Sequence, residues 1–435
     1  MSVRFRCLMG AAVLALLPGA PAVADTLEDA IASAFATNPQ IDLERSETDL
    51  AREGLEQARS RGRPTVNLNG SAGYEYIDTT SPFAFNLGDR SLATAQVQAV
   101  QPIYTGGGVS AGIRQAKAGI NAADSQYEAV QQDLVLSVVT AYVDVRKDRE
   151  TVAIRKNNVD VNAEQVRAAN DRFDVGVVTR TDVALANARQ EGAKAALAGA
   201  EATLEGSEAN YELLIGKAPG DLVPPPPIPP LPASFDEAVL IALDNNPDIK
   251  AARHGERAAN EAIKVARAQY RPQLSIVGSA GVQETYGSDS DQRDTSVSAV
   301  AQGTIPLLSG GLIKSQVSSA RLQRDQARNR VDLLERQVRA QVAQAWYGYS
   351  ASLRSIEASR RQVDAAEIAY AGAQEELAVG VRTTLDVLDQ EQQLFEARLA
   401  LVQSERDAYV AAYRLLRAAG QLDKHVAPAF ASDYE

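Results

Sequence analysis

The sequence predicts a mainly helical protein with a smaller amount of β-structure, built from two similar halves. Three observations indicate this fold class. Apolar residues recur every three or four positions through two very long segments, shorter segments alternate between apolar and polar residues, and the same motifs occur twice in the same order along 435 residues. Aromatic residues make up only 5% of the chain, and such a composition favours long packed helices over a thick globular core.

The N-terminal segment has the features of a secretory signal peptide. Arg4 and Arg6 precede the short apolar run LMGAAVLALL, and small residues including Ala22 and Ala24 follow it. The run is well below the ~20 residues that a helix needs to cross a bilayer. We therefore expect a signal peptide over 1–24 that is cleaved after Ala24 and carries away Cys7, the only cysteine. Since no later segment is apolar over about 18 residues, we expect any membrane-spanning part to be made of strands.

Two parts of the chain repeat the same motifs in the same order. The matching pairs are TLEDAIASAFATNPQI (26–41) with SFDEAVLIALDNNPDI (234–249), RPTVNLNGSAG (63–73) with RPQLSIVGSAG (271–281), and QPIYTGGG (101–108) with IPLLSGGL (305–312). Three collinear matches are hard to attribute to chance, so we expect an internal duplication. The expected parts are a first repeat over 25–218, a Pro-rich linker over 219–233, a second repeat over 234–420 and a C-terminal tail over 421–435.

Each repeat begins with two helices and a β-hairpin. An Asn-Pro pair ends the first helix and an Arg-Pro pair ends the second, because proline disfavours helical backbone in the residue before it. The period then changes from helical to two, and we expect strands at about 64–77, 92–103, 272–286 and 295–306. Such strands have one apolar face and, when tilted, are long enough to cross a bilayer. Their apolar faces contain few large apolar side chains, so a soluble β-hairpin on a helical scaffold stays open as an alternative.

A long helical hairpin follows the strands in each repeat, over 108–216 and over 310–419. Glycine clusters precede both hairpins. Since neither has the G-x-x-x-x-G-K-[ST] pattern of a phosphate loop, they serve to bend the chain from strand into helix. The first helix of each hairpin holds ~65 residues, roughly 100 Å at ~1.5 Å per residue, and its three-four spacing indicates coiled-coil packing. The turn that ends it reads VGVVTRTDVAL (175–185) in the first repeat and VGVRTTLDVLD (379–389) in the second.

Composition and motifs exclude several classes of function. The net charge is −12 and no basic patch with interleaved aromatic residues occurs, so we expect no nucleic-acid partner. The two histidines, His254 and His425, stand in unrelated contexts, and the sequence has no metal-spaced cluster and no nucleophile arrangement. We therefore expect no enzyme activity, no catalytic residue, no metal and no cofactor. The carboxylates spread along the helices are most simply solvated faces.

The two turns share a local pattern. Gly176 and Gly380 each follow a long helix, as expected of a helix C-terminal glycine. Thr179-x-x-Asp182 and Thr383-x-x-Asp386 have the pattern of N-capping signals for the returning helix. This local role by itself accounts for the glycine, the threonine and the first aspartate of both copies.

The second turn differs from the first at two positions. It has Arg382 where the first copy has Val178, and Asp389 where the first copy has Leu185. Asp389 is three residues from Asp386, so both carboxylates lie on the same helix face. Capping does not explain these two differences.

The turn segments resemble those of the outer membrane efflux protein family, the TolC-like channels. The resemblance is carried by RFDVGVVTRTDVALANARQE (172–191) and LAVGVRTTLDVLDQEQQLFEARLAL (377–401), and by QPIYTGGG and IPLLSGG, which are similar to the family's strand-to-helix junctions. It covers the chain in order from the end of the signal peptide to about residue 425. It implies a homotrimer in which a twelve-stranded outer-membrane β-barrel, with four strands from each chain, continues into a long α-helical coiled-coil barrel.

The resemblance also implies a function and its partners. Channels of this family are passive ducts through the outer membrane of the Gram-negative envelope, in contact with its lipid and gated at a periplasmic tip. They serve tripartite efflux pumps or type I secretion, together with a periplasmic adaptor (membrane fusion) protein and an inner-membrane transporter. Four strands cannot close a membrane barrel, and open strand edges are excluded from lipid, so a membrane-embedded chain has to oligomerise. Two copies would give a barrel filled by side chains, and three a wider one. The alternative function is a periplasmic structural coiled coil without a membrane barrel.

Particular residues take roles by the same resemblance. Asp386 and Asp389 match the aspartates that ring the family's periplasmic constriction, where carboxylates favour cations. Arg382 resembles the arginine that links neighbouring hairpins in the closed tip, with Thr181 and Asp182 as its partners. These five residues are the expected constriction and gating latch. We therefore expect gating and ion preference to depend on the second copy, with the first copy supplying the partner surface.

The ends of the turns are where the resemblance places contact with the adaptor. The residues concerned are Val175, Gly176, Val379 and Gly380. Leu377 departs from the family pattern, which has a tyrosine that supports the latch. We therefore expect a latch that is weaker or built differently.

Overall fold

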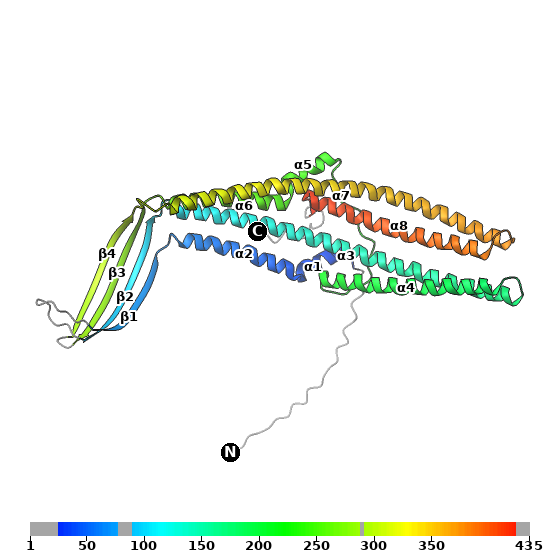
Figure 1. Ribbon diagram of the computed structural model, residues 1–435, viewed down its shortest axis with the longest axis horizontal. Helices are drawn as coiled ribbons and strands as arrows, with labels where there is room; N and C mark the ends of the chain where they lie inside the picture. The colour runs from blue at the N-terminus through cyan, green and yellow to red at the C-terminus, as the bar shows by residue number, and fades with distance from the viewer. Residues whose placement is uncertain (1–24, 77–88, 288–290, 423–435) are drawn as a thin grey trace, which may run out of the picture.

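The computed structural model describes residues 25–76, 89–287 and 291–422. The expected signal peptide, residues 77–88 and 288–290 between paired strands, and the C-terminal tail from residue 423 with His425 lie outside the described residues. The described chain is elongated, with a β-sheet at one end, a helical body next to it and, at the far end, the two turns that connect α3 (Gly108–Asp174) to α4 (Arg180–Ile215) and α7 (Leu312–Ala378) to α8 (Thr384–Ala419) (Figure 1).

The same kinds of elements follow in the same order in the two halves. The first half consists of α1 (Leu27–Thr37), α2 (Pro39–Ser60), β1 (Thr65–Tyr76), β2 (Asp89–Tyr104), α3 (Gly108–Asp174) and α4 (Arg180–Ile215). The second half consists of α5 (Phe235–Asn245), α6 (Pro247–Ala268), β3 (Gln273–Gly287), β4 (Gln292–Thr304), α7 (Leu312–Ala378) and α8 (Thr384–Ala419). The predicted fold class, mainly helical with four strands, is confirmed. The long helices α3 and α7 each have 67 residues.

The Asn-Pro pairs end one helix and begin the next. Asn38 Oδ1 accepts a hydrogen bond from the amide of Gln40 (2.9 Å), which caps α2 with proline at its first position. Asn38 Nδ2 also donates to the carbonyl of Leu214 at the end of α4 (3.1 Å). Asn246 does the same in the second half, where its Oδ1 caps α6 and its Nδ2 donates to the carbonyl of Ala418 (3.2 Å). Each asparagine therefore ties two short helices to the end of a long hairpin.

The strands form one antiparallel sheet in the order β1-β2-β3-β4. The middle pair, β2 with β3, joins the two halves, so both long hairpins leave the sheet toward the same end of the molecule (Figure 1). β2 begins at Asp89, earlier than the expected start near 92, because Arg90 Nε reaches across to Glu75 Oε2 on β1 (2.9 Å). β4 begins earlier than expected, at Gln292, and ends at Thr304, before Pro306. Within the described residues, β1 and β4 each pair on one side only.

The two faces of the sheet differ in polarity. Residues paired across neighbouring strands point to the same face. One row across all four strands consists of Leu68, Val97, Ala280 and Val297. The adjacent row, on the opposite face, consists of Asn67, Gln98, Ser279 and Ser298. Leu68 is 73% exposed and Val297 is 81% exposed, so the described residues leave these two ends of the apolar row uncovered.

The buried core lies in the middle of the helical body, where α1 packs against α3 and α4. It combines aliphatic side chains with the fully buried rings of Tyr142, Tyr211 and Tyr413. The Tyr142 hydroxyl lies within hydrogen-bonding distance of the carbonyls of Asp25 (2.9 Å) and Val223 (2.8 Å). These contacts fix the Pro-rich linker, which forms no helix, against the core. In the second half α5 packs against α7 and α8 over a smaller cluster.

Two arginines of α8 fasten the second half to the first. Arg417 donates through Nε and Nη2 to the carboxylate of Asp133 on α3 (2.6 and 3.0 Å) and also reaches Asp248 on α6 (3.1 Å). Arg406 donates in the same forked way to Asp144 on α3 (2.7 and 3.1 Å). Consequently α8 is held along α3, the long helix of the other half. None of the described helices is apolar over a stretch long enough to cross a membrane.

Candidate functional site at the helical turns

The candidate site lies at the end of the molecule farthest from the sheet, where α3 turns into α4 and α7 turns into α8 (Figure 1). Gly176 and Gly380 take left-handed backbone there, with φ of 78° and 76°, which glycine adopts without steric cost. The amide after each glycine donates back to the long helix, as Val177 N does to Arg172 O and Val381 N does to Glu376 O (2.9 Å in both). The two turns therefore close in the same way.

The returning helices α4 and α8 begin with capping boxes, and the capping role expected from the sequence is confirmed. Asp386 Oδ2 accepts hydrogen bonds from the Thr383 hydroxyl (2.7 Å) and amide (3.0 Å), while Thr383 Oγ1 accepts from the Asp386 amide (3.3 Å). Thr179 and Asp182 repeat this arrangement in the first half. The hydrogen bonds from Thr383, together with the nearby Arg382 charge, lower the pKa of Asp386. Asp386 is therefore ionised at neutral pH.

Asp389 lies one turn further along α8 and is paired with a residue of the other half. Arg189 of α4 donates through Nη2 to Asp389 Oδ1, and the Asp389 side chain remains 50% exposed. Arg172 at the end of α3 also donates to the Thr384 hydroxyl (3.3 Å). These two contacts connect the two hairpins near their turns. The sequence pattern did not indicate Arg189 or Arg172, because each contacts a residue about two hundred positions away.

Arg382 has a partner within its own turn. Its Nε donates to the carboxylate of Glu376, at the end of α7. The expected partners, Thr181 and Asp182, lie exposed in the first turn of α4, where Asp182 is engaged in its capping box. Within one chain the structure therefore brings Arg382 to Glu376, and a link between Arg382 and a neighbouring hairpin stays a prediction. Leu377 is partly buried at the end of α7 and has no polar group for a latch.

The outermost residues of both turns are apolar and exposed. Val175 and Val379 are 73% and 74% exposed, and Val177 and Val381 are similarly open. Single exposed valines are common on protein surfaces. Here the same residue type occupies the same place in both turns, at the end of the molecule.

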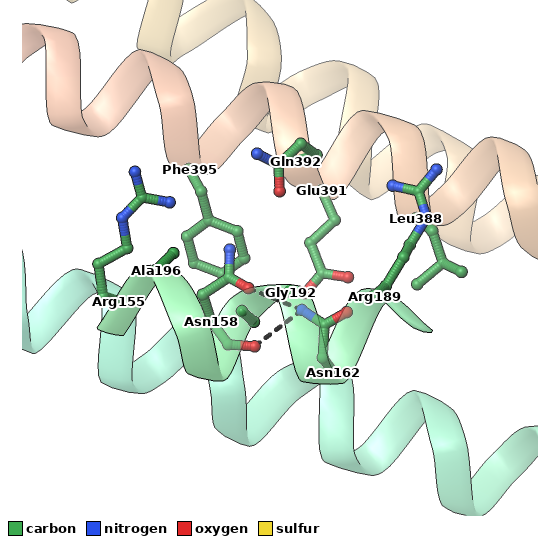
Figure 2. Close-up of a pocket in the computed structure, with 11 residues that line it drawn as sticks. Arg155, Asn158, Asn162, Arg189, Gly192, Ala196, Leu388, Glu391, Gln392 and Phe395 are labelled. Atoms are coloured by element: carbon green, nitrogen blue, oxygen red, sulfur yellow. Dashed lines mark hydrogen bonds between the residues drawn. The ribbon is translucent and has the colours of Figure 1, made fainter. Parts of the chain in front are cut away.

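A cavity of about 230 Å³ lies between α3, α4 and α8, behind the turns. It is lined by Arg155, Asn158 and Asn162 of α3, Arg189 of α4, and Glu391 and Phe395 of α8 (Figure 2). Glu391 is 3% exposed, and neither of its carboxylate oxygens has a hydrogen-bond partner among the described residues. Burial raises the pKa of Glu391 to about 7, an effect that the charge of Arg189 opposes. The expectation that the helical carboxylates are solvated faces is therefore wrong for Glu391, since α8 packs this residue against α3 and α4.

The described residues hold no group of three or more histidine, cysteine, aspartate or glutamate side chains placed to bind a metal ion. The acidic residues near the second turn are instead divided among a helix cap, an ion pair and a buried carboxyl. This arrangement places negative charge near the start of α8, with Arg172 and Arg189 of the other half beside it.

The chain is similar to known proteins over most of its length. A family model described as Outer membrane efflux protein matches residues 30–217 and 239–421. The outer membrane efflux protein BepC of Brucella suis is 32% identical over 95% of this chain and 90% of its own length. The alkaline protease secretion protein AprF of Pseudomonas aeruginosa is 26% identical over 69% of this chain and 64% of its own length. The crystal structure of the outer membrane protein VceC from Vibrio cholerae has the same fold, with a TM-score of 0.77 at 22% identity, covering 91% of this chain and 96% of that one.

Removing one cap should loosen only the helix that it begins. We expect Thr383→Ala to speed amide hydrogen exchange in the first turn of α8 by about fivefold, because a lost capping threonine destabilises a helix start by ~1 kcal/mol. Thr179→Ala is the matched control and should act on the first turn of α4 alone. Exchange measured by mass spectrometry would contradict the capping account if either variant left its own helix start unchanged.

Proposed function

This chain belongs to the outer membrane efflux protein family, and on that premise we propose that three copies form a channel through which substrates leave the periplasm across the outer membrane. The channel is a passive duct for a tripartite efflux pump or a type I secretion system. The names of two relatives support this range, since one is called an efflux protein and the other a secretion protein.

The observation that carries the proposal is the sheet at the end of the helical body. In the part of the chain that the structure describes, β1 and β4 are unpaired on their outer sides and one apolar face is uncovered. In lipid, each unpaired backbone group costs several kcal/mol, so the edges have to be paired by other copies. Two copies give eight strands, which close around a side-chain-filled interior, whereas three give twelve and leave a lumen. The row with Leu68 and Val297 then faces lipid, and the row with Ser279 and Ser298 faces the lumen.

The helical body continues this duct into the periplasm. The long helices α3 and α7 extend ~100 Å from the sheet, and three copies of the two hairpins surround a common axis. The exposed valines at the turns, Val175 and Val379 with the neighbouring Gly176 and Gly380, form the contact surface for a periplasmic adaptor protein, which connects the duct to an inner-membrane transporter. Their exposure and repetition in both turns support this role.

The constriction is formed by Asp386 and Asp389 of α8. Three chains bring six carboxylates to one narrow point, which favours cations over anions. The hydrogen bonds from Thr383 that lower the pKa of Asp386 keep that carboxylate charged. Arg382 belongs to the latch of the closed state, with Thr181 and Asp182 of a neighbouring hairpin as partners, and its contact with Glu376 holds it beside the turn. Leu377 supplies no hydroxyl, so this latch depends on charge more than on hydrogen bonds.

The alternative function is a periplasmic coiled coil without a membrane barrel. That reading requires the apolar face of the sheet and both sheet edges to meet water, which the large exposure of Leu68 and Val297 disfavours. The two readings differ in a measurable way, because only the channel reading pairs both outer strands.

The proposed channel is tested by planar-bilayer recordings of the protein extracted from the outer membrane. We expect the wild type to conduct with a preference for cations, and Asp386→Ala combined with Asp389→Ala to lower the cation-to-anion permeability ratio by about fivefold, because the charge at the constriction is lost. Asp364→Ala combined with Glu375→Ala removes two exposed carboxylates of α7 and serves as the control. Equal selectivity in the wild type and the constriction variant would reject the acidic ring, and the absence of any conductance would reject the channel.

The latch is tested separately through Arg382. Arg382→Ser should raise the single-channel conductance, since the closed tip loses the positive charge that links neighbouring hairpins. Arg361→Ser removes an exposed arginine of α7 that pairs with Glu357 and should leave the conductance at the wild-type level. If Arg382→Ser behaves like this control, Arg382 is only a surface charge.

A further inference from the structure

Glu391 is a buried carboxyl that neither the constriction nor the latch accounts for. It projects from α8 into the cavity toward α3 and α4 and lies beside Phe395 (Figure 2). It is 3% exposed, and both of its oxygens lack a hydrogen-bond partner among the described residues. An ionised carboxylate in such a place is strongly disfavoured unless a cation or hydrogen-bond donors meet it.

Every element packed around Glu391 contributes charged or titratable groups. On α3, Arg155 lines the cavity. The charge of Glu164, also on α3, adds to the rise in the pKa of Tyr370 on α7 that burial causes. On α4, Arg189 lines the same cavity and is the charge that acts most directly on Glu391. On α7, burial and then the charge of Glu391 raise the pKa of Tyr370, which keeps that phenol neutral. On α8 itself, Asp389 precedes Glu391 by two residues and already holds Arg189.

Arg189 therefore acts on two carboxyl groups of the same helix, one through an ion pair and one through its charge across the shared cavity. Its guanidinium forms the ion pair with the half-exposed Asp389, while its charge also reaches the buried Glu391. Asn158 and Asn162, which line the cavity opposite, are hydrogen-bonded to each other (2.7 Å) rather than to Glu391. Because Arg189 forms its ion pair with Asp389 and no hydrogen bond reaches Glu391 from the described residues, the protonated form of Glu391 fits this arrangement.

We propose that Arg189 is shared between Asp389 and Glu391, so that the ionisation of Glu391 controls both how firmly α8 packs against α3 and α4 and how much Asp389 charge faces the constriction. Arg189 and Glu391 are thus positioning residues for ion selection and gating. This inference rests on the proposed channel function and adds to it a dependence on periplasmic pH.

The direction of the pH effect follows from burial. Burial raises the pKa of Glu391 from 4.5 to about 7 in the packed arrangement, whereas a carboxyl exposed by outward movement of α8 keeps its ordinary pKa near 4.5. The packed arrangement therefore binds the proton more tightly, and its advantage is fully present below about pH 4.5 and declines as pH rises to about 7. Above that range, ionised Glu391 attracts Arg189 away from Asp389. Conductance and cation preference should both rise with pH.

The test compares planar-bilayer recordings of the wild-type trimer, Glu391→Gln and Glu396→Gln at about pH 5.5 and about pH 8. Glu396 is an exposed carboxylate on the same helix, so it is a matched control for loss of one charge. We expect the wild type and Glu396→Gln to gain severalfold in open probability and cation preference at the higher pH, because Glu391 is mostly protonated at about pH 5.5 and mostly ionised at about pH 8. Glu391→Gln should keep the low-pH values at both pH values.

The variants share the other groups that titrate in this range. His254 on α6, whose pKa burial lowers, is present in all three proteins, so its contribution cancels in the comparison. A pH response of Glu391→Gln equal to that of the wild type would overturn the inference while leaving the channel intact. Failure of the wild type to conduct would instead overturn the channel itself.

A second variant tests the shared arginine independently of the carboxyl. Arg189→Gln releases Asp389 from its partner, and we expect it to raise the cation preference at about pH 5.5 toward the wild-type value at about pH 8. If Glu391→Gln does not assemble, this variant still decides the question. A cation preference of Arg189→Gln that stays at the wild-type low-pH value would overturn the proposal.

Discussion

Among the described residues, the outer sides of β1 and β4 are unpaired, and this is the constraint on which the rest of the molecule depends. A sheet of four strands with one apolar face and two open edges cannot lie in lipid as a single copy, and in water its open edges favour aggregation. Pairing of β2 with β3 makes this sheet from both halves of the chain. It also directs both long hairpins to the same end of the molecule, where both of their turns lie (Figure 1).

At that far end the two turns share the same backbone geometry but carry different charged side chains. Both turns use a left-handed glycine and a capping box, which accounts for their shared residues. The second half adds acidic residues on α8, and the first half supplies arginines, with Arg172 beside Thr384 and Arg189 beside Asp389. In the proposed trimer, the charge at the constriction would therefore depend on these contacts between the two halves of each chain.

Local signals explain what was predictable from the sequence. Asn38-Pro39 and Thr383-x-x-Asp386 fix helix starts through contacts within a few residues, and the period-two segments give the strands. The start of β2 was less predictable, because the pair between Arg90 and Glu75 is made across the hairpin. The burial of Glu391 was missed, since it stands in a polar stretch of α8 and only packing against α3 and α4 removes it from water. The contact of Arg189 with Asp389 joins positions far apart in the chain and leaves no periodic signal.

Hydrogen exchange of the strand amides tests the central claim most directly, because it reports whether the sheet edges are paired. The protein would be extracted from the outer membrane, placed in lipid nanodiscs and followed strand by strand. Closure by neighbouring copies predicts that the amides of β1 and β4 exchange as slowly as those of β2 and β3. Rapid exchange confined to the outward-pointing amides of β1 and β4 would show that the edges are open, and would contradict the account.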